Sequence, residues 1–251
     1  MTSDIWTRCA GGSRLRPLAL EAWRAVEAQH QISTRRLVDT AEEQALLEEL
    51  IERVKPPDPT KGRWHYLLAT PFRYPPLRHG SRFGLRRERG IWYGSESVRA
   101  VFAEVAYYRF LFLEGTRAEL GVVETALTVF TVKVRTARGV DLTALPFDRH
   151  RRRLTSKTSW ADTQPLGAAM RATGVEAFRY ASARDVAGGV NTGVFDPAAF
   201  GRSRPGRLET WHCSASRERV EILGRDYFAR LSHEFPRRDF LVDGWLPSPA
   251  P

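Results

Sequence analysis

The stretch GIWYGSESVRAVFAEVAYY, residues 90–108, decides the fold prediction because it changes from a strand pattern to a helix pattern. Its first residues, GIWYG, are aromatic and apolar between two glycines, which is typical of a short buried strand. Over residues 97–109 the apolar positions follow the i, i+3, i+4, i+7 spacing of a buried helical stripe: Val98, Val101, Phe102 and Val105. The stretch therefore predicts a strand, a turn and a helix.

Glu104 lies on this predicted helix, next to the apolar stripe. At about 100° per residue, its side chain points roughly 100° away from the middle of the stripe. Glu96 lies about opposite the stripe and is expected to face water. A carboxylate at the edge of a core is most often a solvated rim residue or the partner of an arginine. Helix geometry by itself therefore gives Glu104 no function.

Short strand-like runs dominate the chain after residue 60. They are WHYLL (64–68), GIWYG (90–94), ALTVFTVKVRT (126–136), EAFRYAS (176–182), VNTGVF (190–195), LETWHC (208–213) and RVEIL (219–223). Helical pattern is limited mainly to residues 97–109, with a weaker case for 161–173. This mixture predicts an α+β fold on a bent or split antiparallel sheet with few helices, not an alternating doubly wound one.

The first part of the chain has a different pattern. Residues 18–54 are predicted to form two helices, and the second starts at TAEE, where Thr40 and Glu43 fit a capping box. The segment KPPDPTKG, residues 55–62, then ends the helix with three prolines. We therefore expect an N-terminal helical segment over residues 1–60 and a second domain over residues 61–251.

Composition limits the classes of partner. The 251 residues are 42% hydrophobic, which is enough for a substantial core. The chain has 39 Lys and Arg against 29 Asp and Glu, and the excess is almost entirely Arg, which suits phosphates and carboxylates. Nucleic acid, an acidic protein and an anionic small molecule all stay open as partners.

Two cysteines, Cys9 and Cys213, form neither a disulfide framework nor a metal-binding spacing. Signal-peptide and transmembrane patterns are not found, so no membrane association is expected and the cytoplasm is the simplest location. The histidines show no metal-binding pairing, and we expect no metal.

Further motifs lie on both sides of Glu104. ATPFRYPPLRHGSRFG (69–84) precedes it, and FRYASARDVAGGVNTGVF (178–195) follows it, with Ser182 between a strand-like run and a glycine-rich turn. Together these pieces resemble the RES-domain family, named for its Arg, Glu and Ser, over about residues 66–195.

The resemblance assigns site residues by position. The matching positions are Arg82 for the arginine, Arg73 for a second basic residue, Tyr93 for an aromatic, Glu104 for the acid and Ser182 for the serine. Two positions depart from the family pattern, which usually has Gly where Ser81 stands and often has Asn where Gly84 stands.

The resemblance also implies a function. Family members are typically toxins of bacterial toxin–antitoxin pairs with an ADP-ribosyltransferase-like split sheet, and they break the nicotinamide–ribose bond of NAD. Water or phosphate could accept the ribosyl group and deplete NAD, or a protein could accept it and become ADP-ribosylated. The expected partner is a cognate antitoxin that covers the cleft and usually has its own DNA-binding domain. Self-association of the chain also stays open.

Each matched residue has a role that this chemistry needs. Glu104 would offset oxocarbenium-like charge on the ribose. Arg82, helped by Arg73, would hold the pyrophosphate, for which arginine's bidentate fork is suited. Tyr93 would stack on the nicotinamide or the ribose edge, and Ser182 would orient the amide or the ribose.

Nucleic-acid binding is the main alternative from composition, with DRHRRRLTSK (148–157) as the basic run and Trp64, Phe83 and Trp92 as the stacking groups. Such runs are usually solvated loops or contacts to an acidic protein, so direct nucleic-acid binding is not the favoured reading. The chain has no G-x-G-x-x-G after a strand, no P-loop motif and no G-x-S-x-G. Side chains, rather than a glycine-rich loop, are therefore expected to bind the phosphates.

Overall fold

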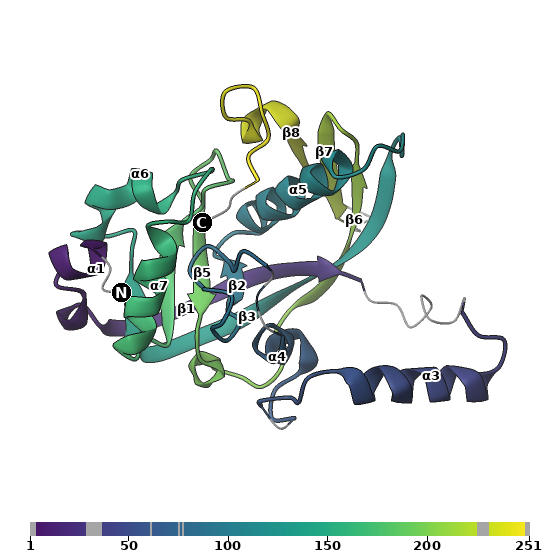
Figure 1. Cartoon of the computed structure of the whole chain (residues 1–251), viewed down its shortest axis with the longest axis horizontal. Coiled ribbons are helices and arrows are strands. Elements are labelled where there is room, and N and C mark those ends of the chain that lie inside the picture. The colour runs from purple at the N-terminus through teal and green to yellow at the C-terminus, as the bar shows by residue number, and fades with distance from the viewer. Residues whose placement is uncertain are drawn as a thin grey trace.

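A mostly antiparallel, eight-stranded sheet forms the framework of the protein (Figure 1). The computed structural model describes residues 4–28, 37–60, 62–74, 76, 78–224 and 231–248. The strands are β1 (Arg16–Glu27), β2 (Trp92–Ser95), β3 (Val123–Asp141), β4 (Ala177–Ala181), β5 (Val190–Val194), β6 (Leu208–Ala215), β7 (Arg219–Gly224) and β8 (Ser232–Pro236). Their order in the sheet is β1-β2-β5-β4-β3-β6-β7-β8.

Six α-helices accompany the sheet in the described part of the chain. They are α1 (Asp4–Arg8), α3 (Ala41–Val54), α4 (Tyr66–Arg73), α5 (Val98–Glu114), α6 (Arg151–Leu154) and α7 (Thr163–Ala172). Short 3-10 turns occur at η1 (Gly11–Ser13), η2 (Phe147–His150), η3 (Pro197–Ala199) and η4 (Arg237–Phe240).

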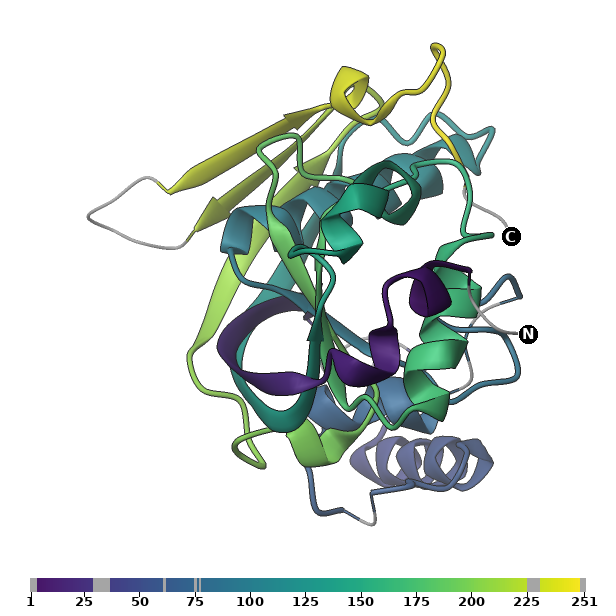
Figure 2. The ribbon, with the colours of Figure 1, turned by 90° about the vertical axis from the view of Figure 1, so that its left-hand side faces the viewer.

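The long strand β3 explains why the sheet is bent. Its residues 123–130 pair with β6, its residues 127–139 pair with β1, and its last residues pair in parallel with β4. The pairing of β1 with β3 closes β1, β2, β5, β4 and β3 into a ring, while β6, β7 and β8 continue away from it (Figures 1 and 2). One strand therefore joins a closed part and an open part of the sheet.

The two halves of β3 bury opposite faces. Leu127 and Val129 pack in a cluster with α5, β6 and β7, whereas Phe130 and Val132 pack in a second cluster with α4 and β2. Because successive side chains on a strand point to opposite faces, the change of buried face marks where the sheet bends between two cores. The predicted α+β class, with a bent and split sheet and few helices, is confirmed.

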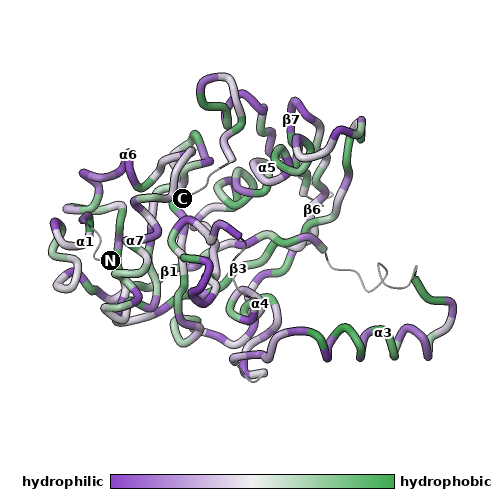
Figure 3. Tube along the Cα trace, in the orientation of Figure 1, coloured by the Kyte–Doolittle hydropathy of each residue, from purple (hydrophilic) through white to green (hydrophobic). Residues whose placement is uncertain are grey.

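The second predicted N-terminal helix is confirmed as α3. The hydroxyl of Thr40 accepts a hydrogen bond from the Glu43 amide at 3.1 Å, and the Glu43 carboxylate accepts one from the Thr40 amide at 3.2 Å. None of its residues is buried, and Leu46 and Leu50 are exposed. Figure 3 shows hydrophobic and hydrophilic residues along α3, which lies beside the body of the protein.

Two predicted elements are wrong. The helix expected from residue 18 is instead β1, whose Ala, Leu, Glu and Arg residues favour helix locally but which pairs with β3 along its length. The strand expected at WHYLL is the start of α4, where His65 caps the helix by accepting a hydrogen bond from the Leu67 amide at 3.3 Å. A run of five apolar or aromatic residues is too short to distinguish the repeat of a helix from the alternation of a strand.

The division at about residue 60 stays a prediction. β1 lies in the proposed N-terminal segment, yet it is hydrogen-bonded into the sheet of the second domain. Within the described ranges, no helix is both long and apolar enough to cross a bilayer.

Candidate active site

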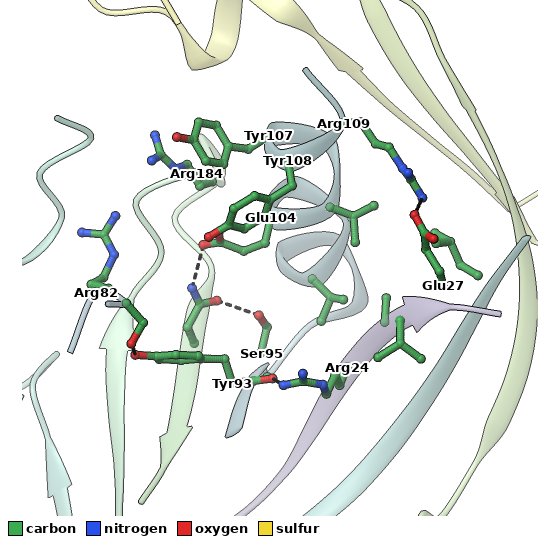
Figure 4. Close-up of a pocket in the computed structure, with 18 of the residues that line it drawn as sticks. Arg24, Glu27, Arg82, Tyr93, Ser95, Glu104, Tyr107, Tyr108, Arg109 and Arg184 are labelled. Atoms are coloured by element: carbon green, nitrogen blue, oxygen red, sulfur yellow. Dashed lines mark hydrogen bonds and ion pairs between the residues drawn. The ribbon is translucent and has the colours of Figure 1, made fainter. Parts of the chain in front are cut away.

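A pocket of about 780 Å³ lies between α5 and the ring of strands (Figure 4). This volume falls within the range that is typical of small-molecule sites, about 300–1,000 Å³. Residues of α5, of the strands β1, β2, β3, β4 and β5, and of the loops line it, and the loop residues are Ser81, Arg82, Trp160 and Arg184. Of the five residues predicted for the site, Arg82, Tyr93 and Glu104 line this pocket.

Glu104 is held by a short chain of hydrogen bonds. The side-chain amide of Asn191 donates to Glu104 Oε1 at 3.2 Å, and the Ser95 hydroxyl donates to the Asn191 carbonyl oxygen at 2.6 Å. Ser95 on β2 lies directly opposite Asn191 on β5 in the sheet register, and both are buried. The sheet therefore fixes the orientation of a carboxylate that α5 presents to the pocket.

The buried stripe of α5 differs from the predicted one. Val101 and Phe102 are buried as predicted, but Val98 and Val105 are only half-buried. The stripe continues along the helix through Ala103, Ala106, Phe110 and Leu113. Val105 borders the pocket together with Glu104 and also packs against the core cluster that contains Val101 and Phe102, so this face of the helix serves both the site and the core.

Glu96 does not face water as predicted. Its carboxylate accepts two hydrogen bonds from the Arg179 guanidinium, at 2.5 and 2.9 Å, and Arg179 also pairs with Asp141 at 2.6 Å. Since α5 begins at Val98, Glu96 lies in the preceding turn, where a helical angle does not apply. This ion-pair cluster links three separate parts of the chain.

Tyr93 supports the segment that carries Arg82. The Tyr93 hydroxyl is 3.0 Å from the Ser81 hydroxyl and accepts a hydrogen bond from the Phe83 amide at 3.2 Å. Burial raises the pKa of Tyr93 to about 12, so the phenol is neutral at ordinary pH. Arg82 donates through Nη1 to the carbonyl oxygens of Ser156 at 2.9 Å and Leu154 at 3.3 Å. Arg82 is thus anchored at one nitrogen while it lines the pocket.

Ser182 shapes a turn and is not among the residues that line the pocket. It is 8% exposed, and its hydroxyl accepts hydrogen bonds from the amides of Arg184 at 3.2 Å and Asp185 at 3.1 Å. The side chain that reaches the pocket from this turn is Arg184. The S-x-R motif contains both Ser182 and Arg184, and the sequence prediction assigned the site residue to Ser182 instead of Arg184.

Arg73 lies elsewhere. At the end of α4, its Nε donates to the carbonyl oxygen of Pro56 at 2.5 Å, and its Nη2 pairs with Glu52 of α3 at 2.8 Å. It does not line the pocket. The structure therefore does not bring Arg73 together with Arg82 and Glu104.

Residues 50–216 match the family model described as the RES domain. This chain belongs to the RES domain family. The match covers more of the chain than the predicted 66–195 and contains all five predicted site residues. Among curated protein sequences, none matches the chain.

Three chains of solved structures match this RES domain protein. One is described as the crystal structure of the M. tuberculosis MbcT-MbcA toxin-antitoxin complex. The two chains are 13% identical, with a TM-score of 0.47, and the match covers 85% of this chain and 92% of that chain.

β1 precedes the RES domain match but forms one wall of the pocket. Arg24 donates to the Tyr93 carbonyl oxygen at 2.6 Å, and burial lowers its pKa to about 10. At the same wall, Glu27 pairs with Arg109 of α5 at 2.6 Å, and Arg109 also donates to the Thr125 hydroxyl at 3.0 Å. Sequence reasoning missed Arg24 and Glu27 because it placed them on a helix.

Candidate metal ligands do not gather in the described ranges, where no three His, Cys, Asp or Glu side chains lie close enough to hold an ion. Cys9 and Cys213 are both buried free thiols.

Proposed function

We propose that this RES domain protein binds NAD, cleaves its nicotinamide–ribose bond and acts as the toxin of a toxin–antitoxin pair. The observation that carries the proposal is the Glu104 carboxylate, fixed by Asn191 in a pocket that Arg82 also lines. Family membership supports it, since residues 50–216 match the RES domain.

The chemistry follows from the charges of the substrate. When neutral nicotinamide leaves, positive charge develops on the ribose, and a nearby carboxylate stabilises that transition state. Asn191 uses Glu104 Oε1, which leaves Oε2 for a ribose hydroxyl. Because the Ser95 hydroxyl holds the Asn191 carbonyl oxygen, the amide nitrogen is the group turned toward Glu104. The carboxylate is therefore positioned before the substrate arrives.

The remaining predicted residues have supporting roles. Arg82 would bind the pyrophosphate through the nitrogens that Leu154 and Ser156 leave free. Tyr93 would contact the nicotinamide or ribose with its ring, since its hydroxyl is engaged by Ser81 and Phe83. Ser182 would act through Arg184, whose backbone amide it holds.

The acceptor of the ribosyl group distinguishes two reactions. Transfer to water or phosphate depletes NAD, and transfer to a protein side chain gives ADP-ribosylation. Both reactions use the same carboxylate, so the site does not select between them. The product that carries ADP-ribose identifies the acceptor.

The direct test is to incubate the purified chain with NAD, without added metal, and to follow free nicotinamide by chromatography. Glu104→Ala and Arg82→Ala should each lose most of the release. ADP-ribose, its phosphate or a modified protein would then identify the acceptor. No release from the unmodified chain, with phosphate or cell extract present, would refute NAD cleavage.

The toxin role requires a partner. We expect an antitoxin, usually with a DNA-binding domain, to cover the pocket, and the net charge of +10 suits an acidic segment on it. Expression in bacteria should arrest growth, and Glu104→Ala should remove the arrest at equal protein level. Equal growth arrest by both chains would show that toxicity does not depend on this site.

The basic run at residues 148–157 is the feature on which nucleic-acid binding would rest. Part of it is used internally, because Arg153 pairs with Asp4 at 3.0 Å and with Asp162 at 2.5 Å. Binding that weakens steeply with salt, in the absence of NAD cleavage, would favour that alternative.

A further inference from the structure

Arg184 is a buried cation without a carboxylate partner among the described residues. It is 3% exposed, and its Nη1 is shielded from solvent with no hydrogen-bond partner in the described part of the chain. A guanidinium stays charged at any ordinary pH, and burying an uncompensated charge is costly. Arg179, by contrast, is matched by the two carboxylates of Glu96 and Asp141.

The contacts of Arg184 hold its position without neutralising its charge. Its guanidinium carbon lies 3.5 Å from the centre of the Tyr107 ring, and Nη2 donates to the Lys157 carbonyl oxygen at 3.4 Å. At 3.4 Å this contact with Lys157 is longer than an ordinary hydrogen bond, so it stabilises the guanidinium only weakly. The Tyr107 hydroxyl is itself tied to the Pro247 carbonyl oxygen at 2.5 Å. The ring is thus a fixed platform for the guanidinium.

The turn that carries Arg184 is also fixed. Ser182 accepts hydrogen bonds from two backbone amides of the turn. Asp185 accepts a hydrogen bond from the Ala187 amide at 3.1 Å and pairs with Arg99 of α5 at 3.3 Å. The nearest acid of the turn is therefore occupied by another arginine and is not available to Arg184.

Two cations, Arg82 and Lys157, and one carboxylate, Glu104, are the charged groups that interact with Arg184. Arg82 lines the same pocket and lies on the same side of Glu104 in Figure 4. Arg184 contacts the backbone of Lys157, and burial, followed by the charge of Arg184, lowers the pKa of that lysine. Glu104 is the carboxylate on this side, and its charge acts on Arg184, but no ion pair joins the two among the described residues, and Asn191 binds Glu104 instead. An anion of a bound ligand would supply the direct ion-pair partner that Arg184 lacks.

We propose that Arg184 and Arg82 form a phosphate-binding subsite of this pocket, for a ligand that carries a phosphate or pyrophosphate group. Two guanidiniums provide the forked donors that phosphate oxygens accept. The inference rests on the proposed function, because NAD, the substrate proposed there, carries the pyrophosphate group. Arg184 then takes the place that sequence reasoning gave to Arg73.

Calorimetry at low salt tests the subsite with ADP, adenosine and inorganic phosphate as probes. Arg184→Gln should weaken ADP binding about 10- to 100-fold, as expected for loss of hydrogen bonds from a charged group, and should leave adenosine binding unchanged. Arg152→Gln, an exposed arginine of α6, removes the same charge and should bind ADP normally. Equal ADP affinity in Arg184→Gln and the unmodified chain would overturn the proposal.

The inorganic phosphate arm separates the two sources of the anion. If phosphate competes with ADP, both use this subsite; if both bind together, the subsite belongs to the pyrophosphate alone. Thermal unfolding without ligand separates binding from a structural role. The midpoint of Arg184→Gln should not fall below that of Arg152→Gln, and stabilisation by ADP should be lost. A lower midpoint with stabilisation by ADP retained would make Arg184 structural.

Arg184→Lys serves as a second variant if Arg184→Gln does not fold. It keeps the charge but not the fork, so ADP binding should weaken while adenosine binding stays the same. The outcomes also separate this inference from the proposed function. ADP binding that depends on Arg184, in a chain that releases no nicotinamide, would retain the subsite and refute cleavage. Nicotinamide release with an unchanged KM for NAD in Arg184→Gln would refute the subsite alone.

Discussion

The side-chain amide of Asn191 donates a hydrogen bond of 3.2 Å to the Glu104 carboxylate, and this contact joins the sheet to α5 at the pocket. Asn191 is 1% exposed, and Ser95 fixes its orientation from the neighbouring strand. A neutral donor next to Glu104 positions the acid without cancelling its charge. That arrangement is what stabilisation of a cationic ribose requires.

Replacing Asn191 tests this relationship. Asn191→Asp removes the donor and places a second carboxylate beside Glu104, so two negative charges must share one site. We expect nicotinamide release at neutral pH to fall about tenfold or more. Ser95→Ala, which leaves the amide in place, should have a smaller effect. An unchanged rate in Asn191→Asp would contradict the assigned role.

The raised pKa of Tyr93 predicts how the stability of the protein changes at high pH. This pKa is raised from the ordinary value near 10 to about 12, so the folded chain keeps this proton after the unfolded chain has lost it. The associated stability is present below about pH 10 and is lost as pH rises through about 12. Tyr93→Phe removes this dependence. Its stability deficit relative to the unmodified chain, measured by urea unfolding, should be about 1.4 kcal/mol smaller at pH 11 than at pH 8; an equal deficit at both would contradict this.

The ion-pair cluster of Glu96, Arg179 and Asp141 should contribute to stability and not to binding. Arg179→Met leaves two half-buried carboxylates without their partner, and we expect a loss of about 3 kcal/mol in the free energy of unfolding. Urea unfolding measures the loss, and ADP affinity of the folded variant should stay the same. A variant as stable as the unmodified chain would show that the cluster is dispensable.

Two helices that depend on neighbouring residues in the sequence, through a helix cap or an apolar helix stripe, were predicted correctly. The capping box at Thr40 and Glu43 gave the start of α3, and the apolar repeat gave α5 with Glu104 at the edge of its core. β1 could not be predicted because its residues favour helix and only pairing with β3 makes them a strand. Distant pairings of this kind leave no periodic trace in a short segment.

The site shows the same division. Arg82, Tyr93 and Glu104 meet in one pocket as the motifs predicted, although their roles at NAD stay predictions. Asn191 and Arg184 lie in the motif that pointed to Ser182, but their side-chain contacts depend on the strand register and the turn. Arg24 and Glu27 precede the RES domain match, so no motif of the family could include them.

Removal of β1 should prevent folding. A chain that starts at residue 50, where the RES domain match begins, lacks the strand that closes the ring and the fully buried Ala22. We expect it to be unfolded or insoluble, with loss of the cooperative thermal transition in circular dichroism. Leu50→Gln on the exposed face of α3 is the control and should change stability by no more than about 0.5 kcal/mol. A stable truncated chain would show that the ring closes without β1.

The most direct test of the central claim is the initial rate of nicotinamide release from saturating NAD, measured for the unmodified chain, Glu104→Gln and Glu119→Gln. Glu104→Gln keeps the size of the side chain and removes its charge, and the exposed Glu119 controls for the loss of one acid elsewhere. We predict release by the unmodified chain, an unchanged rate in Glu119→Gln and a fall of about 100-fold or more in Glu104→Gln. Equal rates in all three chains, or no release from any of them, would contradict the account.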